Sequence, residues 1–165
     1  MKQVFSFIMI IALLLFTAGC KQESQTPQGA AFYYCVTTSD YNVGSCALTA
    51  EHRADTTDGS LQEVITKYLA GPLSPELESP FPQELKVVGA YQNGQTVYLT
   101  FSRELATMTG LDLTIACACM TLTVLSITNA EGVEIRTVAG LLDGQRAIIM
   151  DKNTLLLQDT VQEEE

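Results

Sequence analysis

A regular pattern of apolar residues between Ser60 and Pro82 predicts one well-defined helix. The apolar side chains recur at spacings of three and four, so they share one face that must be buried: Leu61, Val64, Ile65, Tyr68 and Leu69. Ser60 and Glu63 have the hydroxyl and carboxylate spacing of a capping box. Gly71 supplies the left-handed residue that closes a helix, and Pro72 cannot continue it. We therefore expect the helix to end at Gly71, with Gly71 at positive φ.

The first β-rich region predicts a hairpin. The runs Ala31–Val36 and Val43–Leu48 flank a turn-like set of small and polar residues. If the turn centres on residues 40–41, the register of the two strands places Cys35 opposite Cys46. We therefore expect these two cysteines to face each other across the ladder, where a disulfide can form.

A second hairpin has a clearer signal. Lys86–Tyr91 and Thr96–Phe101 are joined by a segment that contains Asn93-Gly94, and Asn-Gly is the strongest short turn signal. In the second strand, apolar and polar side chains alternate from residue to residue. This alternation predicts a sheet that is covered on one face only.

The remaining chain predicts one more helix and further strands. Apolar residues at helical spacing mark a helix from Asp112 to about Leu125: Leu113, Ala116, Met120 and Val124. Gly132–Val138 is typical of a strand, and Arg146–Met150 with Leu155–Leu157 is typical of a closing pair of strands. This order of elements predicts an α+β fold, with a mostly antiparallel sheet and two helices packed on one face, in a single domain.

The first 19 residues are typical of a bacterial lipoprotein signal peptide. Lys2 is followed by an apolar run from Val4 to Phe16, and small residues precede Cys20. The alternative is an uncleaved membrane anchor, but a span needs about 20 apolar residues and this run is shorter. We expect cleavage before Cys20 and lipidation of Cys20, which would attach the protein to the outer face of the cell membrane.

Three further segments follow the signal peptide. Residues 20–30 comprise the lipidated cysteine and a polar, proline-containing tether with nothing to bury. Residues 31–158 have the apolar content and length of one folded domain. Residues 159–165 form an acidic tail that is expected to fray.

Four segments, taken in this order, resemble the signature of the GerMN domain, which occurs in bacterial envelope lipoproteins and in proteins of spore formation and germination. They are LTAEHR (48–53), L-A-G-P (Leu69, Ala70, Gly71, Pro72), S-P-F-P (Ser79, Pro80, Phe81, Pro82) and GQTVYLTFSRE (94–104). The last departs from the family pattern, since Thr100 stands where aspartate is more usual. The resemblance covers roughly Ala31 to Asp143, and it implies an α+β interaction module in which the L-A-G-P and S-P-F-P residues have structural roles.

Charge limits the class of partner. All 19 acidic residues, but only eight of the nine Lys and Arg, follow Cys20, so the mature chain carries a net charge near −11. Phosphates would be repelled, which argues against a nucleic acid as partner. Repulsion from an anionic membrane surface means that the lipid on Cys20 would have to supply the attachment.

The cysteines allow two interpretations. Outside the cytoplasm, an even set of four favours disulfides, and the hairpin register suggests Cys35 with Cys46. Cys117 and Cys119 point in different directions on a helix, which favours buried unpaired thiols. The alternative is a four-thiolate zinc site, although C-x-C on a helix lacks the usual knuckle spacing. We expect no metal and no cofactor.

The sequence contains no recognisable catalytic motif. The single histidine, His52, is expected to be a surface residue, and there is no nucleophile elbow, zinc-protease helix or phosphate loop. Three hypotheses follow: an envelope interaction module that binds another protein, as the resemblance implies; a lipoprotein that binds a small ligand or glycan; and a wall-modifying enzyme. We favour the first, without enzymatic activity.

Polar loop residues on a rigid sheet are a common place for recognition. Two sets are candidates for a partner-facing edge: Glu51, His52 and Arg53 ahead of the first helix, and Ser102, Arg103 and Glu104 after the second hairpin. We expect the first set to lie on an exposed approach, where substitutions leave the fold intact.

Overall fold

A computed structural model describes residues 29–36, 48–54 and 59–155. The elements, in chain order, are β1 (Ala30–Val36), β2 (Leu48–Arg53), α2 (Leu61–Leu69), β3 (Leu77–Glu78), β4 (Val87–Asn93), β5 (Thr96–Phe101), the 3-10 helix η3 (Arg103–Thr107), α3 (Gly110–Ile127), β6 (Gly132–Thr137) and β7 (Ile148–Asp151). The α+β class is confirmed. The predicted signal peptide, Cys20, Cys46 and the acidic tail lie outside the described residues.

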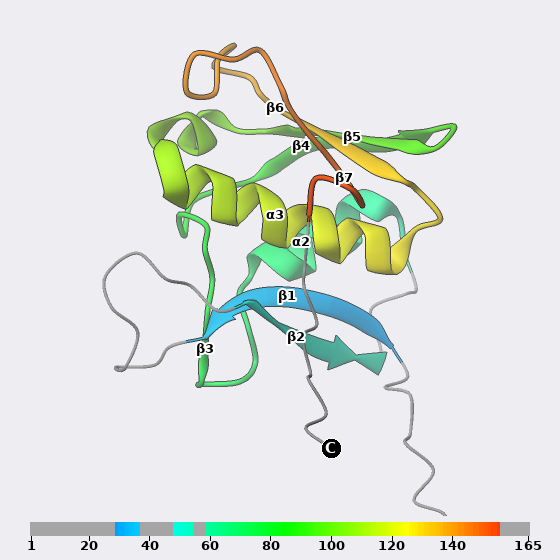
Figure 1. The fold of residues 1–165 in the computed structure, drawn as a ribbon. Helices are drawn as coiled ribbons and strands as arrows, with labels where there is room; N and C mark the ends of the chain where they lie inside the picture. Colours follow the sequence, from blue (N-terminus) through cyan, green and yellow to red (C-terminus); the bar gives the residue numbers. More distant parts are fainter. Residues whose placement is uncertain (1–28, 37–47, 55–58, 156–165) are drawn as a thin grey trace, which may run out of the picture.

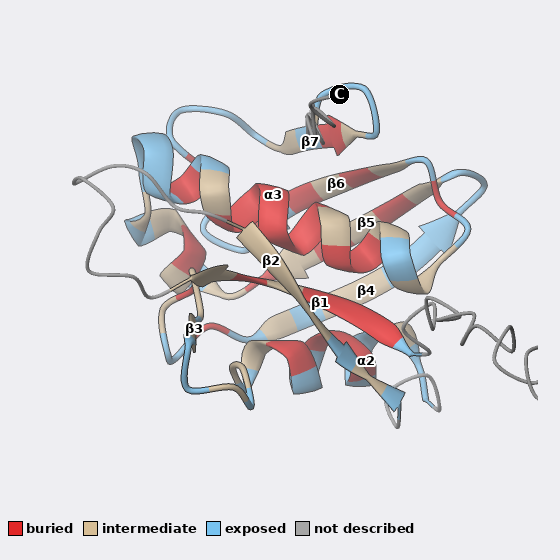
Figure 2. Ribbon diagram, turned by 60° about the horizontal axis from the view of Figure 1, so that its bottom comes forward, coloured by how far each residue is buried: buried red, intermediate tan, exposed pale blue. Residues whose placement is uncertain are grey.

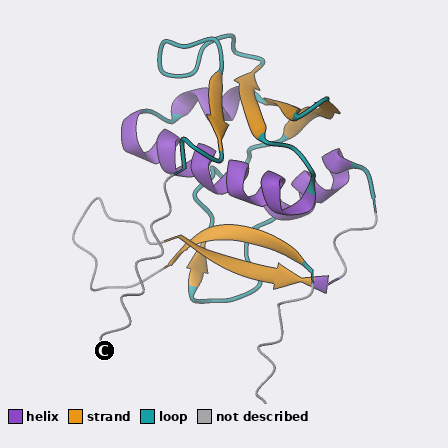
Figure 3. Cartoon of the chain, turned by 45° about the vertical axis from the view of Figure 1, so that its right-hand side comes forward, coloured by secondary structure: helices purple, strands orange, loops and turns teal. Residues whose placement is uncertain are grey.

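The strands form two sheets, and the helices lie between them (Figures 1 and 3). One sheet has the order β2-β1-β3 and is antiparallel; the other has the order β4-β5-β6-β7 and is mixed. Buried residues concentrate on β1, on the inner face of the four-stranded sheet and along α3 (Figure 2). The expected single sheet with helices on one face is therefore divided into two layers, and each layer covers one side of the same helices.

The first helix is built as its sequence predicts. The Ser60 side chain accepts a hydrogen bond from the Glu63 amide at 3.3 Å, and the Ser60 amide donates to Glu63 Oε2 at 2.7 Å, which completes the capping box. Val64, Ile65 and Tyr68 are buried. Gly71 has φ +96°, as expected for the residue that closes the helix.

The second predicted hairpin is confirmed by β4 and β5. Asn93 pairs with Thr96, and Gly94 occupies the tight turn with φ +59°. On β5 the apolar side chains, Val97, Leu99 and Phe101, are buried against the helices. The alternation in the sequence therefore identifies the covered face correctly.

The first hairpin forms with a different second strand and register. The partner of β1 is β2 at Leu48–Arg53 rather than the predicted run 43–48, and Cys35 pairs with Leu48 rather than with Cys46. The prediction was wrong because residues 49–53 are mostly polar or charged and lack the alternation of apolar and polar residues that is typical of a strand. Two of these side chains, Glu51 and Arg53, form hydrogen bonds with the loop that follows α2.

The threonine-rich helix α3 extends from Gly110 to Ile127, slightly beyond the predicted bounds. Its hydroxyl groups cover the edge of β1 that β3 leaves open. The Tyr33 amide donates to Thr123 Oγ1 at 3.0 Å, and Ser126 Oγ donates to the Ala31 carbonyl at 2.8 Å. The Tyr68 hydroxyl, from α2, donates to the Tyr33 carbonyl at 2.6 Å. Side-chain hydroxyls thus take the place of a neighbouring strand.

The last strand pairs differently from the prediction. β5 and β6 run parallel because η3 and α3 cross between them. β7 then pairs antiparallel with β6, and Leu155 does not return as a strand. A turn follows β7 at Asp151, where the carboxylate accepts hydrogen bonds from the Asn153 and Thr154 amides at 2.8 Å.

Candidate functional site

Two segments of the sequence signature meet at an ion pair between Glu51 and Arg53. Both side chains project from β2 toward the loop that follows α2, and they pair with each other. Arg53 Nη2 donates to the Gly71 carbonyl at 2.8 Å. Glu51 Oε2 accepts hydrogen bonds from the Leu73 and Ser74 amides, each at 2.9 Å. The pair therefore fixes the L-A-G-P turn to β2.

Aromatic rings surround the Arg53 guanidinium group. Its central carbon lies 4.8 Å from the centre of the Phe32 ring and 5.7 Å from that of Tyr34. Arg53 Nη2 also donates to the Tyr34 hydroxyl at 3.2 Å, and that hydroxyl donates to the Tyr68 carbonyl at 3.0 Å. Burial raises the pKa of Tyr34 well above its usual value, so Tyr34 stays protonated and can donate.

The pKa of Glu51 reflects the same contacts. Partial burial alone would raise the pKa of this carboxyl, but hydrogen bonds from Ser74, Arg53 and Leu73 together lower it. The side chains of Arg53 and Glu51 are only 11% and 12% exposed. The expectation that they lie on an exposed approach was therefore wrong, and we now assign them to the support of the fold. His52 is exposed on the other face of β2.

The second candidate set lies at the end of β5. Ser102 is a structural connector, since its amide donates to the Lys86 carbonyl at 2.9 Å and its own carbonyl accepts from Thr137 Oγ1 at 2.9 Å. The Arg103 side chain is exposed, and its Nε atom lies 3.8 Å from Glu104 Oε1. Hydrogen bonding from Ser102 lowers the pKa of Glu104. The two sets of candidates belong to different sheets and do not form one site.

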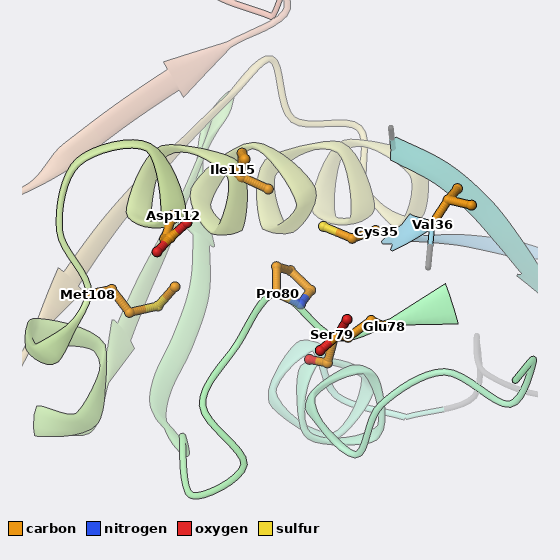
Figure 4. A pocket seen from close by; sticks show the side chains of 8 residues that line it. All are labelled: Cys35, Val36, Glu78, Ser79, Pro80, Met108, Asp112 and Ile115. Carbon is orange, nitrogen blue, oxygen red and sulfur yellow. The ribbon is translucent and has the colours of Figure 1, made fainter. Parts of the chain in front are cut away.

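The S-P-F-P segment divides between the core and the surface. Phe81 is buried, and its ring packs edge-on against Tyr68 with the centres 5.7 Å apart. Ser79 and Pro80, by contrast, face a surface groove (Figure 4). The motif therefore contributes to the hydrophobic core with one residue and to the groove wall with two.

The groove has a volume of about 370 Å³ and lies where three parts of the chain converge. The lining residues are Cys35 and Val36 at the end of β1, Glu78, Ser79 and Pro80 around β3, and Met108, Asp112 and Ile115 at the start of α3 (Figure 4). Its lining combines apolar side chains with two exposed carboxylates, Glu78 and Asp112, and the described residues of the lining include no Lys, Arg or His. This is the site that we regard as the candidate for binding.

The sequence pointed to part of this groove only. Ser79 and Pro80 were identified through the family resemblance, and Cys35 as a cysteine expected to be oxidised. Met108 and Ile115 carried no signal, because apolar residues in a helical region look the same whether they enter the core or line a groove. Asp112 was noted only as the start of the second predicted helix; the structure places it in the first turn of α3.

One of the three described cysteines is oxidised and two are free. Cys35 is disulfide-bonded. Cys46 lies outside the described residues, so the pairing of Cys35 with Cys46 stays a prediction. Cys117 and Cys119 are free and buried in α3, and burial raises the pKa of each thiol to about 12. Within the described ranges, no group of three or more His, Cys, Asp or Glu side chains could hold a metal ion.

Helix α3 is long and apolar enough to cross a membrane by length and composition, with a mean hydropathy of 1.8. However, half of its residues are buried inside the domain, where it packs against β1, β6 and β7. A core helix of a soluble domain passes the same test. The packing of α3 between the two sheets therefore accounts for its apolar character.

The family described as "Germane: Sporulation and spore germination" matches residues 31–142. The chain belongs to this family. The resemblance to GerMN proteins is confirmed, and the matched region contains both helices and the strands from β1 to β6, whereas β7 lies beyond it. No curated protein matches the chain.

Two solved structures are similar to the Germane domain of this chain. One is the "Tandem GerMN domains of the sporulation protein GerM from Bacillus subtilis", with 16% identity and a TM-score of 0.49 over 65% of this chain and 37% of that one. The chain thus spans about a third of that structure's length. The other is the crystal structure described as "Putative Lipoprotein from Clostridium perfringens", with 15% identity and a TM-score of 0.46 over 74% of this chain and 86% of that one.

Proposed function

We propose that this Germane-family protein is a lipoprotein on the extracytoplasmic face of the cell membrane, attached through Cys20, whose domain binds another envelope protein. Its role would be to support envelope or spore assembly, in keeping with the sporulation and germination family to which it belongs. The observation that carries the proposal is the groove, because residues of the family signature, Ser79 and Pro80, form its wall without being needed to fill the core.

The lining of the groove favours a particular kind of partner segment. Pro80, Met108 and Ile115 offer apolar surface, whereas Glu78 and Asp112 are exposed carboxylates. The three ion pairs of the described residues involve neither carboxylate. A segment with an apolar side chain flanked by Lys or Arg would therefore match the groove in both shape and charge.

Site-directed photo-crosslinking in cells tests this proposal. A photoreactive residue in place of Met108 should capture one partner protein, and the same residue in place of Lys67, on the exposed side of α2, should not. Asp112→Lys should abolish the capture, whereas Glu131→Lys, which makes the same charge change at a distant exposed position, should leave it intact. Equal losses with both variants would show that only net charge matters and would reject the groove as the site.

The lipid anchor is tested separately. The proposal rests on the short apolar run that ends in small residues before Cys20. Mass spectrometry of protein extracted from membranes should find Cys20 as the first residue, with acyl chains attached. An intact Met1 or an unmodified Cys20 would reject the anchor, whatever the outcome at the groove.

A small ligand is the second candidate for the groove. The observation that favours it is the volume of about 370 Å³, which lies at the lower end of the range of roughly 300–1,000 Å³ found for small-molecule sites. Native mass spectrometry of the purified full-length protein distinguishes the two. A bound small molecule that is lost on Asp112→Lys would favour this alternative over a protein partner.

We also propose that the domain has no catalytic activity of its own. His52 stands alone on the exposed face of β2, and the carboxylate of Glu51 is already bound by Arg53 and two backbone amides. Among the described residues, the carboxylates of the groove have no histidine or lysine beside them to act as a partner in proton transfer.

A further inference from the structure

The four-stranded sheet has an outer face that lies open to solvent. The helices cover the inner face of this sheet only (Figure 1). Along β5 and β6 the buried side chains alternate with more exposed ones, so the alternate positions point outward. One row of outward positions crosses all four strands: Tyr91 pairs with Tyr98, Tyr98 with Glu134, and Glu134 with Ile149. Three inter-strand steps make this row about 14 Å long.

The row has the composition of an interface. Tyr91 is 59% exposed and Ile149 is 67% exposed, which is unusual for large apolar side chains in the middle of strands. The rings of Tyr91 and Tyr98 stack with their centres 5.1 Å apart, so they form a rigid ridge. Tyr and Arg are the residues that contribute most to binding at protein interfaces, and Arg136 stands beside the row.

The charges on this face and on the rest of the chain limit which partner can approach the sheet. Glu134 pairs with Arg136 on the same strand, so the centre of the face is neutral. The chain as a whole carries a formal net charge of −10, and two copies would repel each other across most of their surfaces. The outer face of the sheet is a place where this repulsion is weak.

The row is also complementary to itself. A two-fold axis that runs parallel to the strands, between two facing sheets, reverses the order of the strands in the second copy. Tyr91 then lies over Ile149 of the second copy, and Tyr98 lies over its Glu134–Arg136 pair, whose guanidinium group can donate to the tyrosine hydroxyl. We propose that a second copy of this chain docks on the outer face of the four-stranded sheet, in a face-to-face dimer.

The size of the face sets the strength of the dimer. The two central strands, β5 and β6, have six residues each, which at about 3.3 Å per residue give a length of roughly 20 Å, and β7 is shorter with four residues. A face of about 20 by 14 Å is smaller than the roughly 800 Å² per partner of a standard interface. The dimer is therefore weak in dilute solution and forms as the protein concentration rises.

Photo-crosslinking between isotopically light and heavy full-length chains tests the dimer. A photoreactive aromatic residue replaces Tyr91 in the light chain, which is mixed with heavy wild-type chain at increasing concentration. The expected product is a light–heavy pair that joins position 91 to the peptide containing Ile149, with a yield that rises with concentration. The same residue in place of Leu73, which is exposed but lies on the loop after α2, should give no light–heavy product.

Two substitutions make the result decisive. Ile149→Asp in the heavy chain should abolish the light–heavy product, while Leu73→Asp, which adds the same charge at another exposed position, should leave it unchanged. Circular dichroism checks that both variants are folded. A product confined to single chains, a light–heavy product that survives Ile149→Asp, or an equal loss with Leu73→Asp would each overturn the dimer.

Discussion

Replacing Glu51 with glutamine should destabilise the domain, because the carboxylate serves two sets of donors at once. Oε1 accepts a hydrogen bond from the Arg53 guanidinium group, and Oε2 accepts hydrogen bonds from the Leu73 and Ser74 amides. A glutamine oxygen can satisfy only one set. If it keeps the two amides, its NH₂ group faces the guanidinium; if it turns toward Arg53, both amides lose their acceptor.

The magnitude follows from how far the pair is covered. An exposed ion pair contributes about 0.2–1 kcal/mol. Breaking a fully buried pair costs about 3–5 kcal/mol, because the remaining charge is left without a partner. The Glu51 and Arg53 side chains are 12% and 11% exposed, so we expect a loss of about 2–3 kcal/mol, between the exposed range and the fully buried one. That loss is a substantial part of the roughly 5–15 kcal/mol that stabilises a typical domain.

Urea unfolding measured by circular dichroism provides the assay. Glu51→Gln should lower the midpoint without changing the slope. Glu104→Gln, at an ion pair that is more exposed, is the matched control and should unfold at nearly the same urea concentration as the wild type. The reasoning is refuted if Glu51→Gln unfolds together with that control.

The pH dependence gives a second check. Because the pKa of Glu51 is lower in the folded state, its contribution to stability is fully present above the unfolded-state pKa of about 4.3 and is lost as the pH falls through the folded-state value. The difference between wild type and Glu51→Gln should therefore be constant near neutral pH and should shrink in acid. A difference that grows in acid would contradict this sign.

Three other outcomes are expected. Gly71→Ala should cost roughly 1 kcal/mol or more in urea unfolding, because φ is +96° and the cost is one of backbone strain, with open space around the added methyl group. Thr123→Val should destabilise the domain by about 1–2 kcal/mol, because the Tyr33 amide of β1 loses its acceptor. Thr121→Val on the same helix should be neutral or stabilising, because Thr121 Oγ1 is buried without a hydrogen-bond partner among the described residues. Equal effects of the two substitutions on stability would contradict this contrast. Peptide mapping without reduction should find Cys35 linked to Cys46, and a link to any other cysteine would reject that pairing.

Short-range signals in this chain predicted structure well. The helix after Ser60 was predicted from its cap to its closing Gly71, because every residue that defines it lies within one turn of its partner. The Asn93-Gly94 hairpin was predicted for the same reason. Where the determining contact is local, the sequence contains both halves of it in one window.

Long-range contacts defeated the prediction elsewhere. The charges of Glu51 and Arg53 suggested a solvated approach, because their partners at residues 71–74 could not be identified before the fold was known. The division into two sheets depends on α3 packing on both, which its uniform apolar pattern does not specify. The groove could be predicted only where the family signature reaches it, at Ser79 and Pro80.

The hydroxyl groups that cover the edge of β1 also affect the order of folding. Tyr33 and Thr123 are 90 residues apart in sequence, and Ala31 and Ser126 are 95 apart. As the chain is synthesised from its N-terminus, β1 can pair with β2 early, and its other edge can gain the contacts of Tyr68 and β3. The Tyr33 amide and the Ala31 carbonyl on that edge stay uncovered until α3 has been made. Closing such a long loop is slow compared with local pairing. During this interval the domain exposes a strand edge that can pair with another chain, so we expect aggregation during folding to begin at β1.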